Sequence, residues 1–395
     1  MNIESILTKN RENLKENAST YLDFIRGISA IIVVLSHLRN TFFVTITESH
    51  LNNIFVKLFY AITGLGHQAV VVFFVLSGYL IATSIFNLIQ AKWSWEKYLT
   101  NRLVRLFVVL IPALFLTYIL DYSTINFLHN AVDKIQNRLS IGTFLGNLFF
   151  LQGIFVPTFG SNDPLWSLSY EFWYYMIFPC LLMVLFSKKI IVKLAYLCIS
   201  FLLLWFIGLK MQIYFLIWLM GAIIVILPKL KITNHIIIKI FKTISVLALI
   251  VACGVSRMAT IGVSTISIQL DMVIGVILTF LIYQLLHYPN NKPKSSDGFK
   301  IFKKSSQIIS GFSYTIYLLH MPIIIFAYSL VSKFGFSKLQ FSITNVLIFI
   351  LMLLGIIGIS YSVSLFTESK TNIIKKNIVD VMHGGFNYKK IEQEV

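Results

Sequence analysis

Apolar runs of about 20 residues recur along this chain and restrict what it can fold into. A helix of that length just crosses the hydrocarbon core of a bilayer. The 395 residues are 57% hydrophobic and only 12% charged, whereas about a quarter of the residues in a soluble domain are charged. The runs are continuous rather than alternating, which favours helices over a transmembrane barrel. The sequence therefore predicts an all-α integral membrane protein.

Ten membrane spans are expected from these runs. Lysine and arginine are about three times as frequent in the terminal segments and every second loop as in the intervening loops. Because cytoplasmic loops carry an excess of these residues, we expect both termini in the cytoplasm and a multi-pass protein of the inner membrane. The expected spans are 22–43, 68–90, 103–122, 165–187, 190–208, 212–228, 236–254, 267–287, 307–331 and 342–366.

The spans divide the chain into three expected regions. Residues 1–20 form a cytoplasmic tail, residues 21–368 the transmembrane domain, and residues 369–395 a second cytoplasmic tail. The apolar stretch 143–156 is too short to span a bilayer. We expect it to be a re-entrant or interfacial segment that packs against protein within the long outer loop 123–164.

The net charge of +17 raises the question of a nucleic-acid partner. The cations are dispersed through short loops, which membrane topology alone produces, so no nucleic-acid partner is expected. The three cysteines, Cys180, Cys198 and Cys253, all fall in apolar segments. Their spacing indicates neither a disulfide framework nor a metal site, and no metal is expected.

The first span, within residues 21–40, contains three ionisable side chains: Asp23, Arg26 and His37. Arg26 and His37 are eleven residues apart, which is about three helical turns. Both therefore lie within about 20° of one helix face and about 16 Å apart along its axis. An arginine and a histidine at membrane depth are expensive to expose to lipid. This face must contact protein or water.

Each of these side chains has a functional and a structural interpretation. The imidazole of His37 can act as a general base toward a hydroxyl, or make a structural hydrogen bond. Arg26 can bind the phosphates of an anionic substrate, because guanidinium suits bidentate recognition, or anchor the helix at the interface. Asp23 lies three residues earlier, where it can orient Arg26 or offset its charge.

Two more motifs fall in the second and third spans. Arg102 and Arg105, in NRLVRLF, share one helix face at the inner end and form a candidate phosphate clamp. The positive charge of inner loops explains them equally well. In FFVLSGY, Gly78 predicts close packing of helices. Ser77 precedes it without the G-x-S-x-G context of a nucleophilic serine.

The segment PLWSLSYEFWYYMIFP, residues 164–179, surrounds Glu171 with aromatic side chains. A buried carboxylate needs a partner or a raised pKa, so we expect Glu171 to pair with an arginine or histidine from another span. The aromatic residues are typical of a belt at the outer membrane interface: Trp166, Tyr170, Trp173, Tyr174 and Tyr175.

His320, in SYTIYLLHMP, lies about halfway along the ninth span. It is a candidate for a second catalytic or acceptor-binding group, or a satisfied structural histidine. Asp121 and Asp271 fall at outer span ends, where we expect them to be solvated or to cap helices. The other histidines, His67 among them, lie in loops or near span ends and receive no role.

These motifs, in this order, resemble the acyltransferase-3 family of membrane acyltransferases over about residues 20–366. No single motif is specific, but the set with its spacing is. The matching residues are LDFIRG at 22–27 followed by His37, FFVLSGY at 73–79, Arg102 and Arg105, WSLSYE at 166–171, and SYTIYLLH at 313–320.

The resemblance implies a ten-helix fold and an acyl transfer reaction. The donor would be cytoplasmic acyl-CoA, usually acetyl-CoA, and the acceptor a hydroxyl of an extracytoplasmic or lipid-linked glycan. His37 would deprotonate that hydroxyl, or carry the acyl group itself. Glu171 would orient the imidazole or bind the sugar.

The same resemblance assigns residues to roles. The family's essential arginine–histidine pair matches Arg26 and His37. Its cytoplasmic arginine pair, expected near the CoA phosphates, matches Arg102 and Arg105, and its tryptophan–glutamate motif matches Trp166 and Glu171. Residues expected to bind substrate or support the site are Asp23, Ser77, Trp166, Tyr170 and His320.

The chain departs from the family in two places. Many members carry an acidic residue just before the paired phenylalanines, where this chain has valines at 70–72. Some members also carry a C-terminal extracytoplasmic esterase-like domain, where we expect only a short cytoplasmic tail. Transfer is then expected to finish within the membrane domain or on a separate extracytoplasmic protein.

Two other functions fit part of the pattern. A transporter or flippase for a lipid-linked sugar or acyl intermediate would also line its path with Arg26, His37 and Glu171. A structural subunit of a glycan-export complex would leave the arginine–histidine face unexplained. The arginine pair on the CoA side, and the lack of an evident inverted repeat, favour the enzyme. We interpret the chain as a membrane O-acyltransferase, of the type that acetylates bacterial surface polysaccharides.

Overall fold

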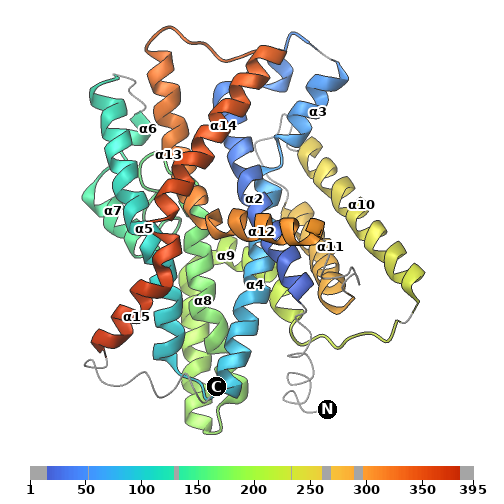
Figure 1. Ribbon diagram of the computed structural model, residues 1–395. Coiled ribbons are helices and arrows are strands. Elements are labelled where there is room, and N and C mark those ends of the chain that lie inside the picture. Colours follow the sequence, from blue (N-terminus) through green and yellow to red (C-terminus); the bar gives the residue numbers. More distant parts are fainter. Residues whose placement is uncertain are drawn as a thin grey trace.

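The computed structural model folds into a single bundle of helices (Figure 1). It describes residues 16–51, 53–128, 133–232, 234–259, 268–288 and 297–382. Most of the expected N-terminal tail (residues 1–15) and the end of the C-terminal tail (residues 383–395) lie outside the described residues. The first described helix begins, and the last one ends, toward the lower side of the view in Figure 1.

Nine helices within the described residues are long and apolar enough to cross a membrane, which confirms the all-α membrane fold. They are α2 (Glu16–Phe42), α4 (Gly66–Gln90), α5 (Trp95–Asn126), α8 (Leu165–Phe186), α9 (Ile190–Ile223), α10 (His235–Ala259), α11 (Ile268–His287), α13 (Ser313–Ser332) and α14 (Ile343–Ser364). The shorter elements are η1 (Ile46–Glu48), α3 (Ile54–Ile62), α6 (Asp133–Gln136), α7 (Ile141–Leu148), α12 (Asp297–Gly311), η2 (Glu368–Lys370) and α15 (Thr371–Met382).

The difference between ten expected spans and nine long helices lies in α9. This element joins two helical segments across a kink at Gly208, whose φ of 72° and ψ of 168° are not helical. Gln212 Nε2 donates across the kink to the carbonyl oxygen of Leu204 at 2.8 Å. The break falls where the sequence separates the fifth span from the sixth.

The ninth span begins later than expected, because residues 307–311 belong to α12. In Figure 1, α12 runs across the bundle instead of along it, and it packs against α2. A Cβ atom on Gly27 of α2 would lie 3.0 Å from the backbone carbonyl carbon of Ile309. Gly27 therefore lets α12 pack closely against α2, one residue after Arg26.

The apolar stretch 143–156 begins within α7 and continues as a loop. An eight-residue helix is about 12 Å long and cannot cross a bilayer. Its buried Asn147 donates to the carbonyl oxygen of Pro157 at 2.9 Å and accepts from the Phe159 amide at 3.1 Å. The expectation for Asp121 is wrong: its side chain is fully buried and accepts from the Ser161 amide at 2.7 Å, which holds this loop on α5.

Helices α4 and α9 cross at two glycines. A Cβ on Gly78 would collide with the carbonyl oxygen of Trp218, and a Cβ on Gly221 would collide with that of Val75. Lipid supplies no hydrophobic force that drives helices together, so close backbone contact of this kind stabilises the pair. The packing role predicted for Gly78 is confirmed.

We therefore expect Gly78→Ala to destabilise the protein by about 1–3 kcal/mol, because the methyl group meets backbone and not a flexible side chain. The unfolding midpoint in detergent measures the effect. Gly254→Ala is the matched control, since a Cβ there has no neighbour within 4 Å and alanine favours a helix. Equal midpoints for the two variants would contradict the packing argument.

Candidate active site

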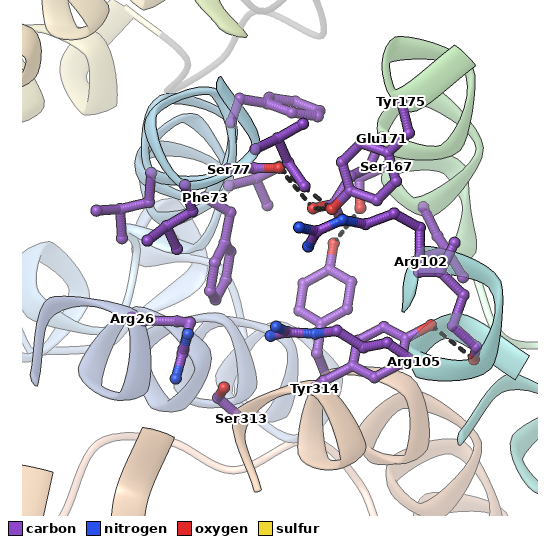
Figure 2. A pocket seen from close by; sticks show the side chains of 18 residues that line it. Arg26, Phe73, Ser77, Arg102, Arg105, Ser167, Glu171, Tyr175, Ser313 and Tyr314 are labelled. Atoms are coloured by element: carbon purple, nitrogen blue, oxygen red, sulfur yellow. Dashed lines mark hydrogen bonds between the residues drawn. The ribbon is translucent and has the colours of Figure 1, made fainter. Parts of the chain in front are cut away.

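A cavity of about 110 Å³ opens between α2, α4, α5, α8 and α13. Figure 2 shows that α2 and α5 contribute its arginines, and that α8 and α13 contribute most of its hydroxyl groups. We call this cavity the arginine pocket. Its polar lining residues are Arg26, Ser77, Arg102, Arg105, Ser167, Glu171, Tyr175, Ser313, Tyr314 and Tyr317.

Three arginines expected to bind phosphate meet in this pocket. Arg102 and Arg105 reach across it from α5, and Arg26 lies on the opposite wall (Figure 2). Arg26 Nη2 donates to Asp23 Oδ1 at 2.9 Å, which is the pairing that the sequence predicts. Arg102 Nη2 donates to Ser84 Oγ at 2.6 Å, and Arg105 is exposed. Guanidinium groups arranged in this way can bind an anionic group bearing several oxygens.

Glu171 also lines the pocket, but its partners differ from those expected. Its Oε1 accepts from Ser77 Oγ at 2.7 Å and from the hydroxyl of Tyr175. Trp218 Nε1 donates to Ser77 Oγ at 3.2 Å. Among the described residues no arginine or histidine lies within ion-pair distance of this carboxylate, so the predicted pairing is wrong. Hydroxyl groups donate the hydrogen bonds that a buried carboxylate needs, in place of a positively charged partner.

A second carboxylate lies beside the arginines and comes from the far end of the chain. Glu368 Oε2, in η2, accepts from the backbone amide of Thr315 at 3.0 Å and from its hydroxyl at 2.9 Å. It therefore caps the first turn of α13. It also interacts electrostatically with Arg26 and Arg105. No motif in the sequence marks Glu368 as a residue of the site.

His37 and His320 form a pair outside the arginine pocket. Their ring centroids lie 5.2 Å apart. His320 is fully buried, and its Nδ1 lies 3.0 Å from the carbonyl oxygen of Ile316. A carbonyl only accepts, so Nδ1 carries the hydrogen and the neutral ring presents Nε2 as an acceptor. That Nε2 has no partner within the described residues. The pair can therefore accept protons.

His37 itself remains partly accessible although it does not line the arginine pocket. Within the described residues its imidazole makes no hydrogen bond. Asp163, two residues before α8 begins, interacts electrostatically with His37 and is held by Arg138, whose Nη1 lies 2.6 Å from Asp163 Oδ1. Neither Asp163 nor Arg138 belongs to a motif that the sequence analysis assigned to the site.

Tyr317 lies between the pocket and the histidines. It lines the pocket, and its ring centroid is 6.0 Å from that of His320. Its hydroxyl is 2.6 Å from Ser167 Oγ. Tyr317 belongs to the motif SYTIYLLH, so the signal was in the sequence, but no role was assigned to it.

Trp166 and Tyr170 lie in the packed interior rather than in the pocket. Their rings contact each other at 5.0 Å, and both contact Tyr214 of α9 at 5.9 Å. Tyr170, Tyr174 and Tyr175 are buried, so the interfacial belt predicted for them is wrong. Aromatic residues are common both in the packed core between helices and at the membrane–water interface, so their number in this segment does not distinguish the two.

Asp271 is neither solvated nor a cap, contrary to the expectation. It is fully buried at the start of α11, where its Oδ2 lies 2.8 Å from His67 Nε2 and 3.0 Å from the hydroxyl of Tyr214. His67, to which no role was given, therefore joins α4 to α11. The described residues contain no group of three or more His, Cys, Asp or Glu that could hold a metal ion.

Comparisons with known proteins place this chain in a family. No solved structure matches the chain. An uncharacterised protein of Haemophilus influenzae is 31% identical over 123 residues, which is 30% of this chain and 49% of that protein. The chain thus spans about half the length of the curated relative that it matches. A sequence model described as "Acyltransferase domain" matches residues 19–365, nearly the full chain. The chain belongs to the acyltransferase-3 family.

Proposed function

We propose that this membrane acyltransferase moves an acetyl group from cytoplasmic acetyl-CoA to a hydroxyl of an extracytoplasmic or lipid-linked glycan in the inner membrane. The observation that carries the proposal is the convergence of Arg26, Arg102 and Arg105 on one pocket. Acyl-CoA is an acyl donor whose far end bears several phosphates, and guanidinium groups bind phosphate bidentately.

The histidine pair supplies the base in this proposal. His37 takes the proton of the acceptor hydroxyl as its oxygen attacks the thioester carbonyl carbon. A C–O bond forms, the tetrahedral intermediate collapses, and the C–S bond breaks. The CoA thiolate leaves with the bonding electrons, and the proton that His37 took is released to it, which restores the neutral imidazole. His320 packs against the His37 ring and positions it.

The test of the donor is acetyl-CoA binding to the purified protein in nanodiscs, measured by calorimetry. We expect Arg102→Gln and Arg105→Gln each to weaken binding about 10- to 100-fold, because each removes charge-assisted hydrogen bonds to phosphate. S-acetylpantetheine, which lacks the 3′-phosphoadenosine diphosphate, is expected to be insensitive to both variants.

Lys188→Gln removes an exposed cation from the chain outside the pocket, and it serves as the matched control. Its affinity for acetyl-CoA should equal that of the wild type. Equal affinities for all four proteins would show that the pocket does not bind the phosphates. If acetyl-CoA does not bind at all, the donor assignment fails and a transporter becomes the better interpretation.

A further inference from the structure

We propose that Tyr317 is a closed barrier between the arginine pocket and the histidine pair, held shut by its hydrogen bond to Ser167. The use of this barrier in acyl transfer rests on the proposed function, but the barrier itself can be tested without any substrate. Tyr317 is a positioning residue in this proposal, because it separates two half-sites and donates nothing to the reacting atoms.

The first observation is the separation of the two sites. Phe73, Ser167 and Tyr317 line the arginine pocket, whereas neither His37 nor His320 does. Figure 2 shows Phe73 and Ser167 in the wall of the pocket. His37 nevertheless keeps accessible surface. Within the described residues, the lining of the arginine pocket thus does not extend to either histidine.

The second observation is that, among the described residues that line the pocket, Tyr317 is the one whose ring contacts both another pocket residue and a histidine. Its ring packs edge-on against Phe73, with centroids 5.6 Å apart, on the pocket side. On the other side its centroid is 6.0 Å from that of His320, one turn further along α13. The side chain is buried, so its ring fills the space between the two sites.

The third observation is the hydrogen bond between Tyr317 and Ser167, which we call the latch. Ser167 Oγ donates to the carbonyl oxygen of Pro164 at 3.2 Å, and the Tyr317 hydroxyl also donates to that carbonyl, at 3.4 Å. Ser167 Oγ and the Tyr317 hydroxyl lie 2.6 Å apart and share a hydrogen bond. Both residues are buried. This bond ties α13 to the first turn of α8. Turning the Tyr317 ring away breaks the hydrogen bonds of its hydroxyl to Ser167 and Pro164 and leaves Phe73 in place.

A barrier here has a clear chemical use. A thioester in the arginine pocket is kept from water that reaches His37 from the opposite side. The acyl group meets the histidines only when the ring of Tyr317 turns. Transfer to the acceptor then competes better with hydrolysis, as in active sites that exclude water.

Cysteine accessibility tests the barrier directly. Cys180, Cys198 and Cys253 are replaced by serine, and Ser77, which lines the pocket, becomes the single cysteine. A membrane-impermeant sulfonatoethyl methanethiosulfonate is applied to spheroplasts and to inside-out vesicles. We expect Ser77→Cys to react from the cytoplasmic side only. Adding Tyr317→Ala should make the introduced cysteine react from both sides. Its labelling rate from the outer side should be at least tenfold higher than that of Ser77→Cys alone.

Tyr314→Ala is the matched control. Tyr314 also lines the pocket from α13, but its hydroxyl donates to the carbonyl oxygen of Leu106. Within the described part of the chain, its ring does not stack on either histidine. Tyr314→Ala should leave the introduced cysteine unreactive from the outer side. Tyr317→Phe keeps the ring and removes only the hydroxyl, so it is expected to fold even where Tyr317→Ala does not. It should raise the outer rate about three- to tenfold, because the hydroxyl that bonds to Ser167 and Pro164 is lost.

The barrier proposal would be overturned if neither Tyr317 variant changed the labelling rate from the outer side. It would also be overturned if Tyr314→Ala raised that rate as much as the Tyr317 variants do. Reaction from both sides in the parent would overturn it too. None of these labelling rates depends on acetyl-CoA, so a protein that binds no acetyl-CoA can still show the barrier. In that case the proposed function fails alone.

Discussion

Replacing His37 with alanine is expected to lower the rate of acetyl transfer to glycan by about 10²- to 10⁴-fold, the usual contribution of a general base. Acetyl-CoA affinity should change less than about twofold, because His37 does not line the arginine pocket. Radiolabelled acetyl-CoA, incubated with the protein in nanodiscs and with envelope glycan from the host, measures transfer. Calorimetry on the same samples measures binding.

His235→Ala is the control for this experiment, because that side chain is exposed at the start of α10. It should transfer and bind as the wild type does. A His37→Ala protein that transfers at the wild-type rate would remove His37 from the mechanism. Joint loss of transfer and binding would instead indicate a structural role.

Asp271→Ala is expected to give the largest loss of stability, about 3–5 kcal/mol in the free energy of unfolding. The substitution leaves His67 and the hydroxyl of Tyr214 without their shared acceptor inside the bundle. Removing one partner of a buried pair costs far more than the pair contributes as a whole. The unfolding midpoint in mixed micelles with increasing SDS measures the change.

Asp297→Ala provides the comparison, since Asp297 is largely exposed and pairs with Lys300 on the surface of α12. Its unfolding midpoint should match the wild type, because exposed pairs contribute little. Two aspartates that behave alike would show that the buried contacts of Asp271 do not hold α4, α9 and α11 together.

The fold was largely predictable because apolar length alone marks spans. The apolar runs do not indicate the turn between α12 and α13. Residues 307–311 are apolar enough to read as part of the ninth span, yet α12 ends at Gly311 and α13 begins at Ser313. Hydropathy measures a segment's composition and not its direction, so a helix lying across the bundle and one crossing the bilayer look alike at their junction.

The arginines of the site were predictable and several of their partners were not. Asp23 and Arg26 are three residues apart, so helix periodicity pairs them. Glu171 with Ser77, Asp271 with His67, and His37 with His320 each join different spans. Such pairs depend on how helices rotate and slide against each other, and neither the period of one helix nor its charge reports that.

The cap that Glu368 places on α13 bears on the order of events during biosynthesis. Arg26 and Arg105 belong to the first and third long helices, whereas the carboxylate beside them follows the last. While the ribosome is still making α14, the first amides of α13 lack this acceptor and the arginines lack this countercharge. The electrostatic balance of the pocket is thus complete only once the final membrane segment has entered the bilayer. Completion of the arginine pocket is a late step of translation, and a chain interrupted before Glu368 carries all three arginines without it.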